Sequence, residues 1–149
     1  MDNSQFCPDI AVTSQEGETV LLVEVKRSAK TDYNDGLVRL RAYCQALEKD
    51  VFLMLVNTGQ YWLWNSSSEE PIYTGATPLL LANYIDLQKV PLTQLDGYSF
   101  ASVVYSWLGS VIFKDSATLL KMPTQKWLVE SGIHQQIYRG YIHRERVLA

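Results

Sequence analysis

The sequence predicts an α/β fold, with a mixed sheet built on a strand–strand–helix–strand core and followed by a mostly helical C-terminal half. Two continuous apolar runs, at residues 20–23 and 51–56, have the length and composition of buried strands. Between them, residues 37–47 carry apolar side chains at three-and-four spacing, which predicts an amphipathic helix. From Thr77 onward, helix signals replace strand signals.

Composition indicates one well-packed domain. The chain has 149 residues, of which 47% are hydrophobic and 19% charged, so it can bury a sizeable core and shows no sign of disorder. Its formal net charge is −3. Because domains that bind nucleic acid over much of their surface are usually basic, any contact with nucleic acid must come from a local patch.

No targeting or membrane-spanning segment is visible. The N-terminus lacks the basic and apolar regions of a signal peptide, and no apolar run approaches the roughly 20 residues of a spanning helix. Cys7 and Cys44 have neither the spacing of metal ligands nor the density of a disulfide scaffold. We therefore expect a cytoplasmic protein with no membrane partner.

The first strands and the helix predict a specific connectivity. Residues 10–13 form a short β-branched segment, residues 14–18 have a hairpin-turn composition, and residues 19–25 form a buried strand, so the two strands should pair antiparallel. The helix at residues 37–47 then leads to the strand at 51–56. A helical crossover between strands predicts parallel pairing and a right-handed connection.

The rest of the chain is predicted to hold an aromatic strand at residues 61–64, which a turn at 57–60 folds back as a hairpin on the strand at 51–56, and then four helices. Thr77 and Pro78 should start the first of these, Ser99 should cap the second, and Gly132 should separate the last two. The four helices are expected at residues 79–87, 100–113, 124–131 and 133–144. The predicted organisation is a core at 1–64, a linker loop at 65–76 and a helical extension at 77–149 that packs on the core or forms an interface.

Two acidic residues and a lysine are expected to meet at one end of the sheet. Asp9 directly precedes the first strand, and Glu24 and Lys26 are two positions apart, so they project from the same face of the second strand. Converging carboxylates repel one another unless a cation lies between them, and hard oxygen ligands suit Mg²⁺ or Mn²⁺. The alternative is that Glu24 and Lys26 simply pair with each other at the rim of the sheet.

The arrangement of Pro8-Asp9, a hairpin, Glu24-Val25-Lys26, a helix and a further buried strand resembles the PD-(D/E)XK nuclease superfamily, whose fold is called restriction-endonuclease-like. The resemblance extends over residues 8–64. That superfamily's core begins with a helix and a first strand, whereas seven residues precede Pro8 here. A longer chain, a partner or the helical half would have to supply that element.

The helix that carries Tyr43 and Gln45, together with residues 56–64, is similar to the N-terminal nuclease domains of type I restriction subunits. The resemblance implies that Asp9 and Glu24 are metal ligands and that Lys26 is the catalytic lysine. It also implies that the Val25 backbone carbonyl completes the protein's metal ligands and that Gln45 supports the site.

Positive charges follow the same stretch. Besides Lys26, they belong to Arg27, Lys30, Arg39 and Arg41. This cluster is either a solvated loop and helix face or a patch that contacts phosphates. Phosphate contact would reconcile DNA binding with the negative net charge.

Two functions are consistent with these features. The first is a Mg²⁺-dependent nuclease-like domain that hydrolyses phosphodiester bonds in DNA. The second is a catalytically inactive protein of the same fold that serves as a binding or oligomerisation module. Residues 100–113 are apolar nearly all round, which indicates burial within the domain or a homodimer interface formed by the helical half.

Overall fold

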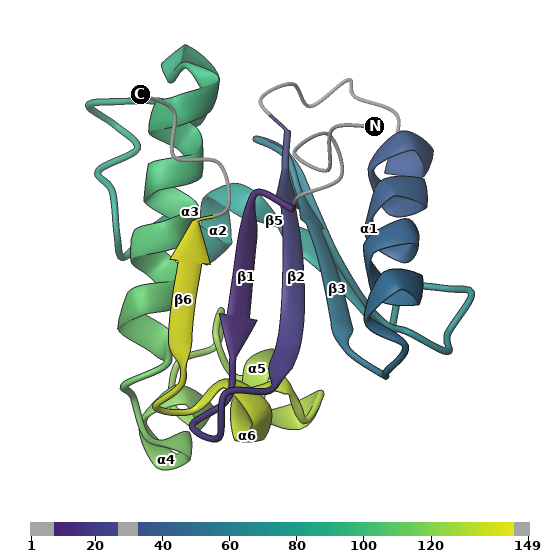
Figure 1. Cartoon of the computed structure of the whole chain (residues 1–149). Coiled ribbons are helices and arrows are strands. Elements are labelled where there is room, and N and C mark those ends of the chain that lie inside the picture. The colour runs from purple at the N-terminus through teal and green to yellow at the C-terminus, as the bar shows by residue number, and fades with distance from the viewer. Residues whose placement is uncertain (1–7, 27–32, 145–149) are drawn as a thin grey trace.

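A single six-stranded sheet forms the centre of the protein in the computed structural model, which describes residues 8–26 and 33–144 (Figure 1). The strand order is β5-β4-β3-β2-β1-β6. The strands are β1 (Ile10–Thr13), β2 (Thr19–Val25), β3 (Phe52–Val56), β4 (Gln60–Asn65), β5 (Tyr73–Ala76) and β6 (Tyr141–Arg144). The helices are α1 (Tyr33–Leu47), α2 (Thr77–Leu81), the 3-10 turn η2 (Leu92–Gln94), α3 (Gly97–Val111), α4 (Ser116–Leu120), α5 (Trp127–Glu130) and α6 (Ile133–Ile137).

The predicted pairing of the first four strands is confirmed. β1 and β2 are antiparallel with Ile10 opposite Val23, β2 and β3 are parallel, and β3 and β4 form a hairpin. The turn between β1 and β2 is closed by Ser14, whose backbone N–H donates to Glu18 O at 2.7 Å. Gly17 adopts a positive φ of 85° there, a conformation that glycine reaches without strain. The mixed α/β fold with a parallel central pair is therefore present.

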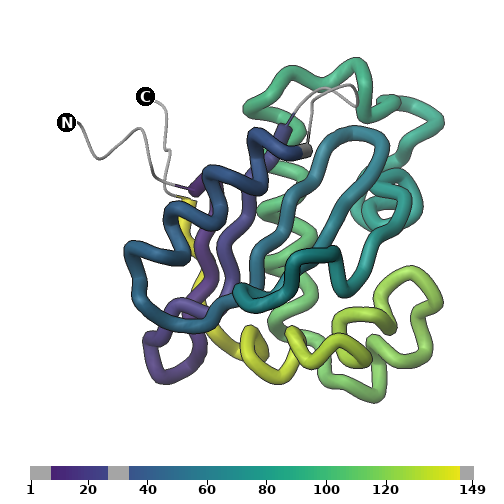
Figure 2. The backbone as a smooth tube through the Cα atoms, turned by 90° about the vertical axis from the view of Figure 1, so that its right-hand side faces the viewer, coloured from purple at the N-terminus to yellow at the C-terminus, as the bar shows by residue number. Residues whose placement is uncertain are grey.

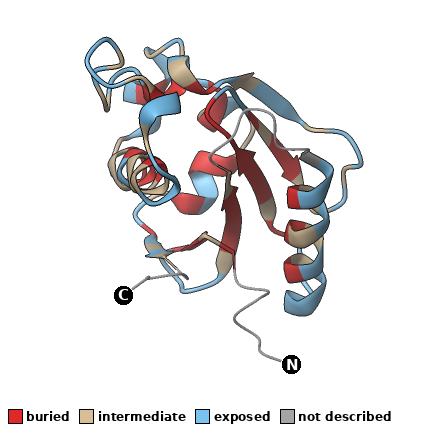
Figure 3. Ribbon diagram, turned by 90° about the horizontal axis from the view of Figure 1, so that it is seen from above, coloured by how far each residue is buried: buried red, intermediate tan, exposed pale blue. Residues whose placement is uncertain are grey.

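Helix α1 covers one face of the sheet, and the smaller of two apolar clusters lies beneath it. Leu40 and Tyr43 point inward from α1 and pack with Leu22, Leu53 and other side chains of the central strands. Figure 3 shows the helix with a buried side against the strands and an exposed side toward solvent. This is the amphipathic pattern that the sequence predicted, and it sets which side chains of α1 reach the sheet.

Helix α3 covers the opposite face (Figures 1 and 2). Its residues Phe100 and Trp107 are fully buried in the larger apolar cluster, together with side chains of β1, β2 and the C-terminal helices. The predicted cap at Ser99 is wrong by one turn. The N-cap is Asp96, whose side chain accepts a hydrogen bond from the Ser99 backbone N–H at 2.7 Å, so Ser99 is already helical.

The predicted helix over residues 133–144 is wrong in its second part. Helix α6 ends at Ile137, and residues 141–144 form β6 alongside β1, with Ile10 opposite Arg144. Arg139 has a positive φ of 56°, which stops the helix, and its backbone N–H donates to Ile112 O at 2.8 Å. The outer edge of β1 needs backbone partners, and β6 supplies them.

Other boundaries in the second half also differ from the prediction. The helix that starts at Thr77 ends at Leu81, and the one expected over 124–131 is reduced to α5. Helix α4 was not predicted, nor was β5, which lies within the expected linker and pairs with β4. The second half is thus not simply helical: β5 and β6 give the sheet its two edges. No helix in the described ranges is long and apolar enough to cross a membrane.

Candidate active site

Glu24 is the buried charge around which the candidate site is built. It is the penultimate residue of β2, stands opposite Leu55 of β3 and is only 1% exposed. Because side chains alternate along a strand, Glu24 shares its face with Leu22 and points beneath α1. A carboxylate in such a place needs compensating partners.

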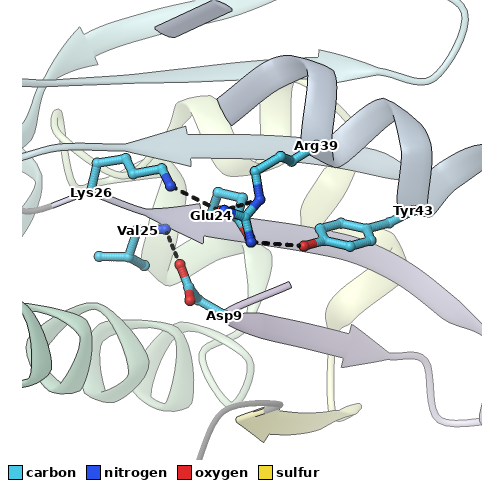
Figure 4. A network of polar contacts seen from close by, with 6 residues as sticks. All are labelled: Asp9, Glu24, Val25, Lys26, Arg39 and Tyr43. Carbon is cyan, nitrogen blue, oxygen red and sulfur yellow. Dashed lines mark hydrogen bonds and ion pairs between the residues drawn. The ribbon is translucent and has the colours of Figure 1, made fainter. Parts of the chain in front are cut away.

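Asp9 lies beside Glu24 from the neighbouring strand. It directly precedes β1, and the pairing of Ile10 with Val23 continues toward Glu24. The Asp9 carboxylate is half-buried, and its Oδ2 accepts a hydrogen bond from the Val25 backbone N–H at 2.7 Å (Figure 4). The antiparallel hairpin predicted from sequence therefore does bring the two acidic residues together.

Two cations contact Glu24, and both reach the same oxygen. Lys26 Nζ lies 3.4 Å from Glu24 Oε2, and Arg39 Nε lies 3.9 Å from it (Figure 4). Arg39 comes from α1, and its Nη2 donates to the hydroxyl of Tyr43 one turn further along, at 3.4 Å. The Lys26 backbone N–H donates to Val56 O at 2.8 Å, so the lysine is anchored to the end of β3.

Burial dominates the electrostatics of Glu24. Loss of hydration raises its pKa, and the negative charge of Asp9 raises it further, whereas Lys26 and Arg39 partly offset both effects. The hydrogen bond to Tyr43 is the main cause that raises the pKa of Arg39, and the Glu24 and Asp9 carboxylates act in the same direction. The site thus combines two close negative charges with two close positive ones.

The donor set fits a divalent cation that is bound through few protein ligands. Glu24 Oε1 is buried and has no hydrogen-bond partner in the described structure, which is unusual for a carboxylate oxygen. Within residues 8–26 and 33–144, no group of three or more His, Cys, Asp or Glu side chains gathers. Mg²⁺ commonly uses one or two carboxylates and takes its other ligands from water and substrate phosphate, so Asp9 and Glu24 fit this ion.

The remaining predicted ligand, the backbone carbonyl of Val25, belongs to the last residue of β2, between Glu24 and Lys26. Its side chain packs on the other face of the sheet, in the cluster under α3. The alternation of the strand therefore sends Glu24 and Lys26 to one side and Val25 to the other, as the sequence predicted.

Several predicted residues lie elsewhere. Gln45 is exposed and lines a cavity of about 80 Å³ with Arg41 and Leu53, away from the contacts to Glu24. Arg41 donates to the backbone carbonyls of Ser66 and Ser68, the latter at 2.6 Å, so it anchors the loop after β4. The remaining predicted phosphate contacts, Arg27 and Lys30, are outside the described residues.

Sequence reasoning missed the part that α1 plays in the site. Arg39 was expected in the patch that contacts nucleic acid, but it contacts Glu24. Tyr43 was given no role in the site, but its hydroxyl accepts a hydrogen bond from Arg39. The spacing of four residues between Arg39 and Tyr43 places them on one helical face, and this was the available signal.

Comparisons of the chain with models of protein families, with curated proteins and with solved structures returned no match. The functional interpretation therefore depends on the geometry of the site itself.

Proposed function

We propose that this protein is a nuclease-like domain of the PD-(D/E)XK type that uses Mg²⁺ or Mn²⁺ to hydrolyse phosphodiester bonds in DNA. The observation that carries the proposal is the environment of Glu24. A carboxylate that is 1% exposed lies next to Asp9 and Lys26, and one of its oxygens has no partner in the described structure. The strand–strand–helix–strand order of the core also agrees with the resemblance of the sequence to that superfamily.

Each side chain of the site has a role in this proposal. Asp9 and Glu24, with the Val25 carbonyl, would hold the metal ion, which when bound supplies a Lewis acid for the phosphate and lowers the pKa of a coordinated water. Lys26 Nζ is tethered 3.4 Å from Glu24 Oε2. From there the ammonium can orient the attacking water or stabilise the charge that develops on the phosphate.

A non-catalytic binding module is the second candidate, and one observation favours it. Lys26 and Arg39 both contact Glu24, so its charge is already compensated by the protein's own side chains. A fold that has lost catalysis could keep such a cluster for stability alone. If the module is a homodimer, exposed apolar side chains such as Leu79, Phe113 and Leu120 are available for its interface, whereas Phe100, Trp107 and the other fully buried residues of α3 pack against the sheet and are not.

Nicking of supercoiled plasmid separates the two functions. The wild-type protein should nick DNA with Mg²⁺ or Mn²⁺ and lose activity in EDTA, and Asp9→Asn should be inactive. Lys26→Ala should lose activity by about 10²- to 10⁴-fold, the usual contribution of a positioned acid–base group. Lys49→Ala is the matched control, since Lys49 is ion-paired with Glu18 and is not part of the site.

Equal nicking by all four proteins would show that the activity comes from a contaminant and would reject the nuclease assignment. DNA binding in EDTA without nicking in any metal would favour the non-catalytic module.

A further inference from the structure

The two carboxylate oxygens of Glu24 lie in different surroundings. Oε2 faces both cations, Lys26 Nζ at 3.4 Å and Arg39 Nε at 3.9 Å. Oε1 is buried and has no hydrogen-bond partner in the described part of the chain. At Glu24 a metal ion would therefore meet one oxygen that has no hydrogen-bond partner among the described residues and one that already faces two positive charges.

Arg39 is held in this position. It projects from α1, and its Nη2 donates to the hydroxyl of Tyr43, a residue that is only 6% exposed. A guanidinium group stays protonated at every pH at which a protein is folded. The result is a permanent positive charge beside Glu24 Oε2, fixed by the helix and not by a flexible loop.

A two-metal site would require different surroundings. Its ions lie about 3.5–4 Å apart, so they commonly share a carboxylate that offers one oxygen to each. Here Oε2 of Glu24 already contacts Lys26 and Arg39, so it does not offer a ligand to a second ion. A second ion would also need further ligands, and among residues 8–26 and 33–144 no third acidic, histidine or cysteine side chain joins the pair.

We propose that this site binds a single divalent cation, through Glu24 Oε1 and Asp9, and that Arg39 stands where a second metal ion would otherwise lie. Arg39 is then a positioning residue: it keeps Oε2 occupied, directs the metal to Oε1 and opposes the entry of a second ion. This inference rests on the proposed function to the extent that both require a metal at Asp9 and Glu24.

Mn²⁺ titration followed by electron paramagnetic resonance tests the inference without any substrate. At about pH 8, far above the ordinary range of a glutamic acid, the wild-type protein should saturate with one Mn²⁺ per chain. Arg39→Gln removes a positive charge a few ångströms from the ion, so its Kd should fall roughly tenfold or more. Arg39→Lys keeps the charge and should bind with the wild-type Kd.

Arg41→Gln is the matched control. It removes the same charge from the same helix, but Arg41 contacts the carbonyls of Ser66 and Ser68 and not Glu24, so its Kd should equal that of the wild type. Near-ultraviolet circular dichroism of each variant checks that the fold is retained.

Two Mn²⁺ ions per wild-type chain, or a Kd for Arg39→Gln equal to or above the wild-type value, would overturn the single-ion arrangement but leave the metal site standing. Absence of Mn²⁺ binding by the wild-type protein would overturn both this inference and the proposed function.

Discussion

The backbone N–H of Val25 donates a hydrogen bond of 2.7 Å to Oδ2 of Asp9. This bond joins the residue before β1 to the last residue of β2, so it helps to close the end of the sheet where the candidate site lies. A carboxylate can accept bonds at both of its oxygens, and one oxygen of Asp9 is engaged in the fold. Asp9 therefore has a structural role that can be separated from its proposed role in metal binding.

Asp9→Asn and Asp9→Ala should separate these two roles. Asparagine keeps an oxygen that can accept from Val25, so its free energy of unfolding should stay within about 0.5 kcal/mol of the wild-type value, whereas alanine should lose roughly 1.5–3 kcal/mol. Both variants should lose Mn²⁺ affinity. Urea denaturation in EDTA measures the stability, and equal destabilisation by the two substitutions would show that the bond to Val25 contributes little.

Glu24→Gln should stabilise the metal-free protein in a pH-dependent way. Burial raises the pKa of Glu24 in the folded state, so the folded protein binds the proton more tightly than the unfolded chain. The stabilisation from that proton is complete below the ordinary glutamate pKa and is lost as the pH rises through the folded-state pKa. Glutamine has no such loss, so its stability advantage should appear over this window and be complete above the folded-state pKa of Glu24.

Thermal unfolding in EDTA at a series of pH values checks the prediction for Glu24. The Tm values of wild type and Glu24→Gln should converge in acid and separate toward neutral pH. Parallel curves would mean that Lys26 and Arg39 compensate the buried charge completely.

Gln125 should contribute strongly to the stability of the second half of the chain. It is fully buried, accepts a hydrogen bond from Trp107 Nε1 at 2.8 Å and donates one to Leu80 O at 3.0 Å. Gln125 therefore links α3 to α2. Gln125→Ala leaves both groups buried without these bonds and should cost about 2–4 kcal/mol, measured by chemical denaturation. Gln135→Ala, at an exposed position of α6, should change stability by less than about 0.5 kcal/mol.

The first half of the fold could be predicted because its signals are local. A hairpin turn at residues 14–18 requires antiparallel neighbours, and a helical crossover requires parallel ones. Strand β6 could not be found this way. Its partner is β1, and the pairing of Thr13 with Tyr141 spans almost the whole chain. Residues 141–144 are extended because the backbone groups on the outer edge of β1 require hydrogen-bond partners. No sequence pattern within residues 141–144 indicates that requirement.

In the candidate site, too, the residues whose positions follow from local signals could be predicted and those that depend on long-range packing could not. Asp9, Glu24 and Lys26 could be grouped from strand alternation and one hairpin, whereas the contribution of α1 depends on how the helix is rotated over the sheet. Gln45 is six positions after Arg39, so the two side chains lie roughly 120° apart around the helix axis. The helix carries both residues, but it turns Arg39 and Tyr43 toward Glu24 and leaves Gln45 exposed.

Substitution of Gly140 should test whether β6 closes the sheet in solution. A Cβ atom at this position would lie 2.0 Å from the Thr13 carbonyl oxygen, and neither backbone can move without breaking the pairing of β1 with β6. Gly140→Ala should therefore cost about 3 kcal/mol of folding free energy.

Gly109→Ala is the matched control: its Cβ meets only Ile142 Cδ1, at 3.9 Å, and alanine should stabilise α3 by roughly 0.5–1 kcal/mol. Urea denaturation gives both values, and hydrogen exchange at the β1 amides should be faster in Gly140→Ala only. If the two alanine variants were equally stable, β6 would not lie against β1, and the outer edge of the sheet beside Asp9 would be open.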